Sequence, residues 1–219
     1  MRSILITGAG TGLGKELALS YAKKGHTIIL TGRRLEPLEA VKEEVQSLGA
    51  QAFAYQMDIS NEADVKNTVG KITSEHTVDY LLNNAGAGCF GPLIELGFDE
   101  IETAIQTNVL GTIFLTKELL PHLLKRGDAK IMNIISTAGQ KGKVNESVYV
   151  ASKFAVRGFT ESLQKELEGK VHVIATYMGG MDTPFWDETN HIKDKSRLKS
   201  PREVAEMIVA QDDKLEIQI

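Results

Sequence analysis

Tyr149 and Lys153 lie four residues apart in the stretch SVYVASKFAV, which begins at Ser147. Helical periodicity places the two side chains one turn apart on one face, with mostly small residues between them. A free tyrosine has a pKa of about 10, so it is a weak acid near neutral pH. A lysine ammonium one turn away favours the phenolate and lowers that pKa. The pair is either two polar residues on a helix surface or a proton donor with the cation that adjusts its acidity.

Short apolar runs alternate with longer amphipathic stretches along the chain. The runs expected to form strands are SILIT, TIILT, AFAYQM, DYLLNN, AKIMNIIS, VHVIATY and a terminal LEIQI. Helices are expected at 15–24, 35–48, 62–75, 98–125, 147–168 and 201–210, the last with Ser200 as N-cap and Pro201 in its first position. This alternation indicates βαβ units, and strands that are apolar on both faces indicate a parallel sheet covered by helices on both sides.

The composition is that of one globular domain spanning 1–219, since α/β domains often reach this length. A net charge of −4 gives no basic footprint for nucleic acid or an anionic membrane, and no run of 18 apolar residues predicts a membrane span. The N-terminus enters an apolar strand without the pattern of a secretory signal. The single cysteine, Cys89, excludes an internal disulfide and fits a reducing compartment, so a cytoplasmic location is expected. The five histidines have no metal-ligand spacing, and no metal is expected.

A strand, a glycine loop and a helix follow one another in SILITGAGTGLGKELALSYAKK. Gly8 lets the chain turn sharply out of the strand, Gly12 lets the backbone approach a phosphate, and Gly14 lets the helix pack closely on the sheet. The unpaired N–H groups at the helix N-terminus favour an anion there. Leu13 breaks the G-x-G-x-x-G pattern, and the P-loop sequence Gly-Lys-Ser/Thr is not present. The motif predicts a dinucleotide site; the alternative is a tight βα turn that binds nothing.

The end of the second expected strand reads LTGRR. Gly32 stands where a fold that prefers NAD places a carboxylate for the ribose 2′-hydroxyl, and Arg33 and Arg34 follow it. A guanidinium pairs with a 2′-phosphate in a fork, and the missing carboxylate removes a repulsion. NADP(H) is therefore favoured over NAD(H), although two arginines on an exposed turn are also common.

Four motifs stand in one order: the glycine loop, NNAG at 83–86, Ser136 at the end of the fifth expected strand, and Tyr-x-x-x-Lys 13 residues later. In this ordered set the chain resembles the short-chain dehydrogenase/reductase family in its compact form, over roughly 4–210. The resemblance implies a doubly wound α/β Rossmann fold with a parallel sheet of about seven strands in the order 3-2-1-4-5-6-7. It also implies a catalytic tetrad of Asn108, Ser136, Tyr149 and Lys153.

Each tetrad residue has a chemical role in the resemblance. Tyr149 would donate a proton to a carbonyl oxygen while hydride reaches the carbon from NADPH, and Lys153 would also hold the nicotinamide ribose. Ser136 would hydrogen-bond the same oxygen as charge develops on it. Asn108 would hold a helix irregularity and a water that relays protons to Lys153. Taken alone, Ser136 could be a polar strand end and Asn108 a helix cap or defect.

The resemblance also implies a cofactor site. Asp58 would meet the adenine amino group, with Ile59 beside the ring; alternatively Asp58 only caps the helix that begins near Asn61. Asn83 is expected to be structural and to tie adjacent strands together. The residues expected to bind the cofactor are Gly8, Thr11, Gly12, Leu13, Gly14, Arg33, Arg34, Asp58, Ile59, Asn84, Ala85, Gly86, Tyr149, Lys153, Gly179, Met181 and Thr183.

The turn after the sixth expected strand departs from the family pattern. It reads YMGGMDTPF, with Met178 where the family usually has proline, while Gly179 and Thr183 keep their places. Proline would fix φ and remove one N–H, so methionine leaves this turn less preorganised.

The irregular stretch 178–199 is predicted to be a substrate lid, since so long a loop in a compact domain is usually functional. Phe185 and Trp186 are adjacent aromatics in it, and we expect them to exclude water from the site; Trp186 could instead pack against the domain. The candidate wall residues for substrate are Gly88, Cys89, Phe90, Ala138, Lys143, Val144, Phe185 and Trp186. Cys89 is expected to be a wall residue rather than a nucleophile, because no motif places a histidine beside it.

The expected function is an NADP(H)-dependent oxidoreductase that transfers hydride between the nicotinamide and a carbonyl or secondary alcohol. A non-catalytic NADP(H) sensor or scaffold is an alternative, and so is a sugar-nucleotide epimerase or dehydratase, which needs a larger C-terminal domain. By resemblance, a homodimer through helices 98–125 and 147–168 is expected, and the family also allows a tetramer. The chain ends in DKLEIQI, and the sequence leaves open whether it is minimal or a tail is missing.

Overall fold

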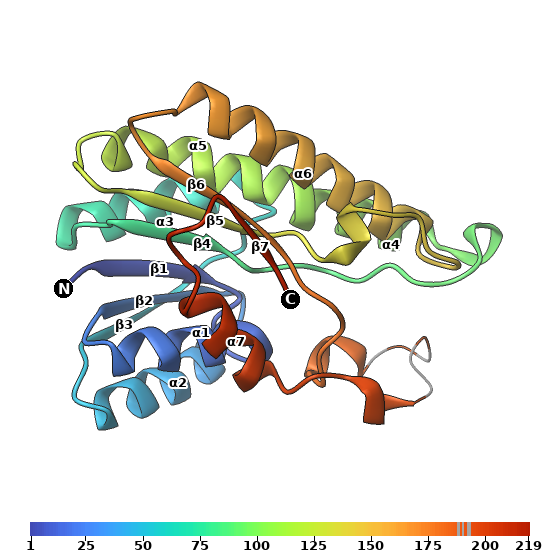
Figure 1. Cartoon of the computed structure of the whole chain (residues 1–219), viewed down its shortest axis with the longest axis horizontal. Helices are drawn as coiled ribbons and strands as arrows, with labels where there is room; N and C mark the ends of the chain where they lie inside the picture. Colours follow the sequence, from blue (N-terminus) through green and yellow to red (C-terminus); the bar gives the residue numbers. More distant parts are fainter. Residues whose placement is uncertain (188, 190, 192–193) are drawn as a thin grey trace.

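The computed structural model describes all residues of the chain except 188, 190 and 192–193. Within this described part, seven parallel strands form one sheet in the order β3-β2-β1-β4-β5-β6-β7 (Figure 1). The strands are β1 Ser3–Thr7, β2 Thr27–Gly32, β3 Ala52–Gln56, β4 Tyr80–Asn83, β5 Lys130–Ile134, β6 His172–Tyr177 and β7 Glu216–Gln218. The predicted doubly wound topology is confirmed, and each strand lies within two residues of its expected bounds.

Helices cover both faces of the sheet, as predicted (Figure 1). They are α1 Gly12–Lys23, α2 Leu35–Ser47, α3 Glu62–Glu75, α4 Phe98–Ile105, α5 Thr112–Leu123, α6 Ser147–Glu166 and α7 Pro201–Val209. α1 begins three residues earlier than expected, because the end of the glycine loop already forms its first turn. Ser200 precedes α7 as its N-cap, but its side chain makes no capping hydrogen bond.

The helix expected at 98–125 is interrupted. α4 and α5 are joined by η2, a π-helical segment at Gln106–Gly111. A π-helical segment is wider than an α-helix by one residue per turn and is often found at functional sites. Apolar periodicity alone did not mark this boundary; the irregularity at Asn108 was expected only from the family resemblance.

Two buried apolar layers hold the helices on the sheet. One face of the sheet packs on α1, α2 and α7, through side chains that include Leu17, Leu38 and Ile208. The opposite face packs on α3, α5 and α6, through side chains that include Val69 and Leu119. Such burial of apolar surface is the main term that stabilises the fold.

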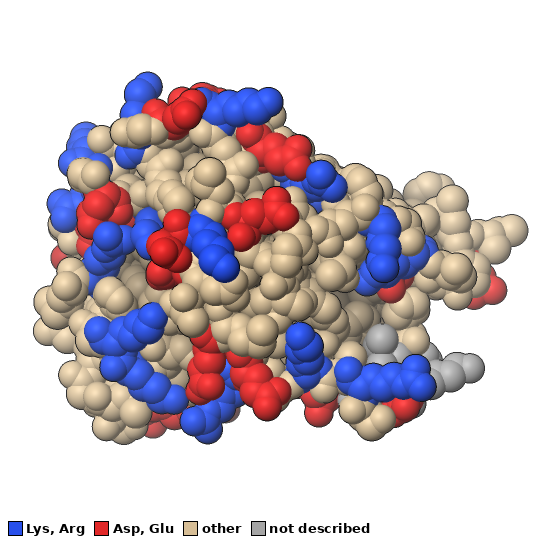
Figure 2. Space-filling model, in the orientation of Figure 1, with Lys and Arg blue, Asp and Glu red and all other residues tan. Residues whose placement is uncertain are grey.

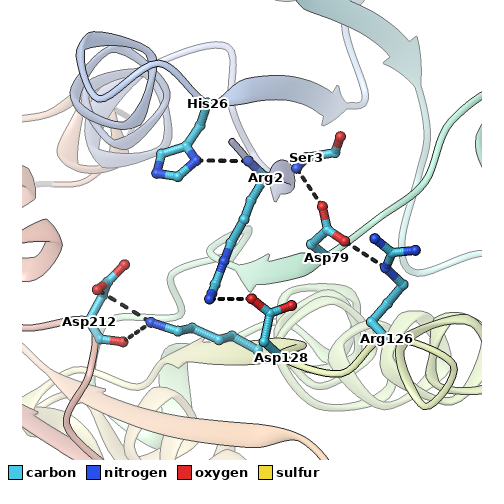
Figure 3. Close-up of polar contacts among 8 residues, drawn as sticks. Arg2, Ser3, His26, Asp79, Arg126, Asp128 and Asp212 are labelled. Atoms are coloured by element: carbon cyan, nitrogen blue, oxygen red, sulfur yellow. Dashed lines mark hydrogen bonds and ion pairs between the residues drawn. The ribbon is translucent and has the colours of Figure 1, made fainter.

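Charged side chains fasten the amino ends of the strands (Figure 3). The Asp79 carboxylate accepts a hydrogen bond from the Ser3 N–H at 2.9 Å and one from Arg126 Nε at 2.7 Å. Lys130 Nζ donates to the Asp212 carbonyl oxygen at 2.6 Å, which ties the segment before β7 to β5. These hydrogen bonds lie at the amino ends of the strands, and the glycine loop lies at the carboxyl ends.

On the face seen in Figure 2, basic and acidic side chains are interspersed.

Gly14 sits where α1 crosses the turn that follows β1. A Cβ on Gly14 would lie 2.3 Å from the Gly8 carbonyl oxygen and 2.6 Å from Asn84 Nδ2. The close packing predicted for Gly14 is therefore confirmed. Gly8 has φ +62°, which confirms the sharp turn out of the strand.

We expect Gly14→Ala to lower the free energy of unfolding by about 2–3 kcal/mol, because the added methyl group meets backbone that cannot yield. Gly70→Ala is a matched control: Gly70 lies in α3, and a Cβ there would meet nothing within 4 Å. This control should gain about 0.5–1 kcal/mol from helix propensity. Urea unfolding followed by circular dichroism measures both, and wild-type stability of Gly14→Ala would contradict the packing argument.

Candidate active site

A cleft of about 850 Å³ lies at the carboxyl ends of the strands. Its walls include Thr7 at the end of β1, Gly32 at the end of β2, Met57 after β3, and Ile134 at the end of β5. β1 pairs with both β2 and β4, so the strand order reverses there. Crevices at this reversal are the usual ligand sites of open α/β sheets.

Most residues expected to bind a cofactor line this cleft. Those in the lining are Gly8, Thr11, Gly12, Leu13, Arg33, Arg34, Asp58, Ile59, Asn84, Ala85, Gly86, Tyr149, Lys153, Gly179, Met181 and Thr183. Gly14 is buried beneath the loop, where its role is packing. The Asn84 side chain also donates to the Thr7 carbonyl oxygen at 2.8 Å, so it joins the ends of β4 and β1.

The alternative role for Asp58, capping α3, is wrong. Asn61 caps that helix by accepting a hydrogen bond from the Asp64 N–H. Asp58 Oδ1 instead accepts from the Ser60 N–H at 2.9 Å and from the Ser60 hydroxyl at 2.7 Å. These bonds hold the turn before α3 and keep Asp58 in the wall of the cleft.

Asn83 is structural, as expected. Its buried Nδ2 donates to Asn133 Oδ1 at 2.8 Å on the neighbouring strand β5 and to Thr116 Oγ1 at 3.0 Å on α5. Asn133 Nδ2 in turn donates to Thr160 Oγ1 at 2.8 Å on α6. Buried amides satisfied in this way give the layers a fixed relative position.

Three residues of the expected tetrad, Ser136, Tyr149 and Lys153, line the cleft. Tyr149 and Lys153 come from successive turns of α6, and Lys153 Nζ lies 5.7 Å from the centroid of the Tyr149 ring. Lys153 Nζ also donates to the Ile134 carbonyl oxygen at 3.0 Å. The spacing that first indicated chemistry thus places both side chains in one wall.

Ser136 has an unusual backbone conformation, with φ +79° and ψ +155°. This region favours glycine, and a side chain there stores strain that surrounding structure must hold. The Ser136 hydroxyl accepts a hydrogen bond from the Ala138 N–H at 3.3 Å. Strain of this kind is concentrated at functional sites.

Asn108 lies behind the cleft, in η2, and is buried. Its Oδ1 accepts from the Ala87 N–H at 2.7 Å, and its Nδ2 donates to the Ala87 carbonyl at 2.9 Å and to Ser152 Oγ at 3.0 Å. The expected helix irregularity at Asn108 is therefore confirmed. The proton relay expected through it stays a prediction.

Burial governs the pKa values of Tyr149 and Lys153 on α6. It raises the pKa of Tyr149 above its ordinary value; interaction with the Ser136 hydroxyl lowers that pKa, and the Glu146 carboxylate raises it. Burial therefore outweighs any lowering of the Tyr149 pKa by Lys153, and the lowering expected from Lys153 stays a prediction. Burial also lowers the pKa of Lys153 to about 8, because its charged form is poorly solvated.

On the side expected to receive substrate, Gly88, Lys143, Phe185 and Trp186 line the cleft. The Phe185 ring lies 6.0 Å from the Tyr149 ring, centroid to centroid. Trp186 stacks on Phe90 at 5.1 Å and donates from Nε1 to the Met181 carbonyl oxygen at 2.9 Å. Trp186 therefore packs against the protein, as the alternative had it, and also lines the cleft; its exclusion of water stays a prediction.

Four substrate candidates, Cys89, Phe90, Ala138 and Val144, lie outside the described lining. Cys89 is buried against Ala104 and Val148, and burial raises the pKa of its thiol. Ala138 is fully buried, and Val144 is 84% exposed. The direction of a loop side chain depends on tertiary packing, which local sequence does not encode.

Glu146 lines the cleft and is nearly buried, although the sequence did not predict it as a site residue. Its only local sign is an uncommon residue type at the N-cap of α6, where Ser, Thr, Asp or Asn is usual. The other polar side chains missed in the lining are Thr7, Thr31, Asp99, Glu100, Thr103 and Thr107.

The stretch 178–199 contains the short helices η4 Pro184–Trp186 and η5 Lys195–Arg197, and Met181 pairs with Lys199 in an isolated bridge. Residues 188, 190 and 192–193 of the predicted lid lie outside the described residues. No cluster of three or more potential metal ligands occurs in the described part of the chain. None of the helices described above is long and apolar enough to span a bilayer.

The family model for short chain dehydrogenases matches residues 2–194. The chain belongs to this family. The NADP-dependent 3-hydroxy acid dehydrogenase of Salmonella typhi is 36% identical over 168 residues, which are 76% of this chain and 66% of the relative. The match thus spans slightly less than two thirds of that relative's length.

Two solved structures of the family superpose closely on this chain. An alcohol dehydrogenase from the archaeon Thermococcus sibiricus, complexed with 5-hydroxy-NADP, has a TM-score of 0.92 at 26% identity and covers 100% of this chain and 96% of its own. A short chain dehydrogenase from Escherichia coli CFT073, complexed with NADPH, has a TM-score of 0.91 at 30% identity, with 99% and 95% covered.

The lowered pKa of Lys153 makes stability depend on pH. The unfolded lysine titrates near 10.5 and the folded one near 8, so the charged folded form costs about 3 kcal/mol below pH 8. Between pH 8 and 10.5 the unfolded state binds more protons, and this cost declines as pH rises.

We therefore expect Lys153→Met to be more stable than wild type at pH 7, and the difference to narrow at pH 9.5. Urea unfolding at both pH values measures it. Other groups titrate alike in both proteins, so a difference independent of pH would contradict the lowered pKa.

Proposed function

We propose that this chain is an NADP(H)-dependent oxidoreductase that transfers hydride between the nicotinamide and a carbonyl or secondary alcohol carbon. The observation that carries the proposal is that Ser136, Tyr149 and Lys153 converge on the cleft that the glycine loop also lines. Membership of the short chain dehydrogenase family supports it, as do relatives that are NADP-dependent or complexed with NADPH.

The residues of the cleft fit a dinucleotide. Thr11 precedes α1 without a side-chain capping bond, so the first N–H groups of the helix are available to a pyrophosphate. A Cβ on Gly86 would lie 3.3 Å from Asn108 Oδ1 and 3.8 Å from Lys153 Nζ. The absence of that side chain leaves room beside Lys153 for a ribose.

Arg33 and Arg34 support the choice of NADP(H). Both are exposed, and both line the end of the cleft at β2, beside Gly32. A phosphate on the adenine ribose would meet two guanidinium groups there and no carboxylate at Gly32.

The chemistry assigns one role to each residue. The cofactor supplies the hydride. Tyr149 donates its proton to the substrate oxygen, and at neutral pH its phenol is protonated, the form that reduction needs. The Ser136 hydroxyl donates a hydrogen bond to the same oxygen, and the Lys153 ammonium stabilises the phenolate left on Tyr149.

A homodimer through α5 and α6 belongs to the proposal as well. These helices lie side by side on one face of the sheet, and Phe154 on α6 is 40% exposed. A cytoplasmic location is likewise proposed, from the single free cysteine.

Tyr149→Phe tests whether Tyr149 is the acid that donates a proton to the substrate oxygen. We expect turnover to fall by about 10²–10⁴-fold, because the proton donor is removed, while NADPH still binds. NADPH consumption over a panel of aldehydes, ketones and 3-oxo compounds measures turnover, and a fluorescence titration measures binding. Tyr55→Phe is the control, since its hydroxyl bonds Glu75 and not the cleft. Equal activity in Tyr149→Phe and wild type would remove Tyr149 as the acid.

The double variant Arg33→Ala/Arg34→Ala tests the preference for NADP(H) over NAD(H). We expect its affinity for NADPH to fall about 10- to 100-fold and its affinity for NADH to change little, since charge-assisted bonds contribute about 1.5–3 kcal/mol. Arg202→Ala, which removes a surface arginine paired with Glu206, is the control for net charge. Equal losses for NADPH and NADH would show that the arginines do not read the 2′-phosphate.

A further inference from the structure

Four rings form one contiguous cluster beside Tyr149; we call Phe90, Phe185, Trp186 and His191 the aromatic wall. The Phe90 ring stacks on His191 at 4.8 Å with an interplanar angle of 12°, and on Trp186 at 5.1 Å with an angle of 29°. Phe185 packs edge-on against Phe90 at 5.8 Å and Trp186 at 5.0 Å. Phe90 and Phe185 both contact the Tyr149 ring, at 5.1 and 6.0 Å. Phe185 and Trp186 line the cleft beside Tyr149, and Phe90 and His191 pack behind them.

A nearly buried contact between two side chains joins this wall to Glu146, the residue before α6. His191 Nε2 lies 3.0 Å from Glu146 Oε1, with side chains that are 18% and 10% exposed. Lys143 Nζ lies 3.8 Å from the second carboxylate oxygen. A contact so shielded from water is stronger and more specific in geometry than a surface pair, and removing one partner leaves the other poorly solvated.

Glu146 belongs to the start of the helix that carries the proposed acid. Its carbonyl oxygen accepts the Val150 N–H at 2.7 Å, whereas its side chain makes no capping hydrogen bond. The carboxylate is therefore directed to the wall and not to the helix. Tyr149 follows three residues later on the same rigid element.

We propose that Glu146 is a positioning residue that holds the aromatic wall through His191 and so fixes the width of the substrate pocket at Tyr149. The wall residues come from two segments far apart in sequence, one before and one after α6. The pair ties the second segment to the element that carries Tyr149 and Lys153. Misplacement of a pocket wall by a small distance changes binding of the reacting group strongly.

Trp186 gives a direct readout that needs neither cofactor nor substrate, because it is the single tryptophan of the chain. We expect Glu146→Ala and His191→Ala each to raise the acrylamide quenching constant of Trp186 about twofold or more, as the wall loosens. Glu146→Gln, which keeps an oxygen acceptor for His191, should restore most of the protection. Glu161→Ala is the matched control: it removes a carboxylate from α6 that pairs with Arg157 on the surface.

The expected effect of Glu146→Ala on substrate kinetics rests on the proposed function. With the best substrate of the panel, we expect Glu146→Ala to raise KM on the order of tenfold, with a smaller change in kcat and unchanged NADPH affinity. In a double-mutant cycle, the effects of Glu146→Ala and His191→Ala on quenching should not add, because both break one contact.

Additive effects, or quenching of Trp186 that is unchanged in both single variants, would overturn the proposal. If Glu146→Ala does not fold, His191→Ala and Glu146→Gln still decide it, since His191 lies outside the helices. A wild-type protein without turnover on any substrate would refute the proposed function. The quenching of Trp186 would still test the contact between Glu146 and His191, because it needs neither cofactor nor substrate.

Discussion

A chain of buried side-chain hydrogen bonds crosses the centre of the molecule. It runs from Thr116 on α5 to Asn83 on β4, then to Asn133 on β5 and Thr160 on α6, whose hydroxyl donates to the Val156 carbonyl at 2.6 Å. A buried amide that loses its partner costs free energy, so these four elements have one favourable alignment. The same elements carry the candidate site: Ser136 follows β5, Tyr149 and Lys153 lie on α6, and Asn108 lies in η2, which leads into α5.

That alignment allows two locally unfavourable features to persist. Lys153 is a buried amine that donates to the Ile134 backbone carbonyl, and Ser136 holds a backbone conformation that favours glycine. Neither would be retained by local interactions alone. The layers around them are closely packed, so the protein holds the poorly solvated Lys153 amine and the strained Ser136 backbone next to the Tyr149 phenol. The rigid elements thus lie beside residues that lower the stability of the fold, as is common at active sites.

Residue patterns within single elements predicted a large part of this structure. The seven strands, the faces of the sheet, the packing of Gly14 and the shared face of Tyr149 and Lys153 all follow from periodicity or from spacing along one element. The pKa of Tyr149 could not be read in this way, because it depends on how deeply α6 is buried. Contacts between loops could not be read either. Glu146 and His191 are 45 residues apart, and no local pattern links them.

The π-helical segment η2 has a consequence for the helices on either side. One residue more than an α-helix requires is accommodated there, and each residue of an α-helix advances the side chains by about 100°. α4 and α5 are therefore out of rotational phase with each other. α5 keeps Leu115, Leu119 and Leu123 against the sheet, while α4 directs a different stripe, with Ala104 buried, toward the segment that follows β4. The two halves of one continuous helix can thus serve two surfaces, the sheet and the mouth of the cleft, without a break in the chain.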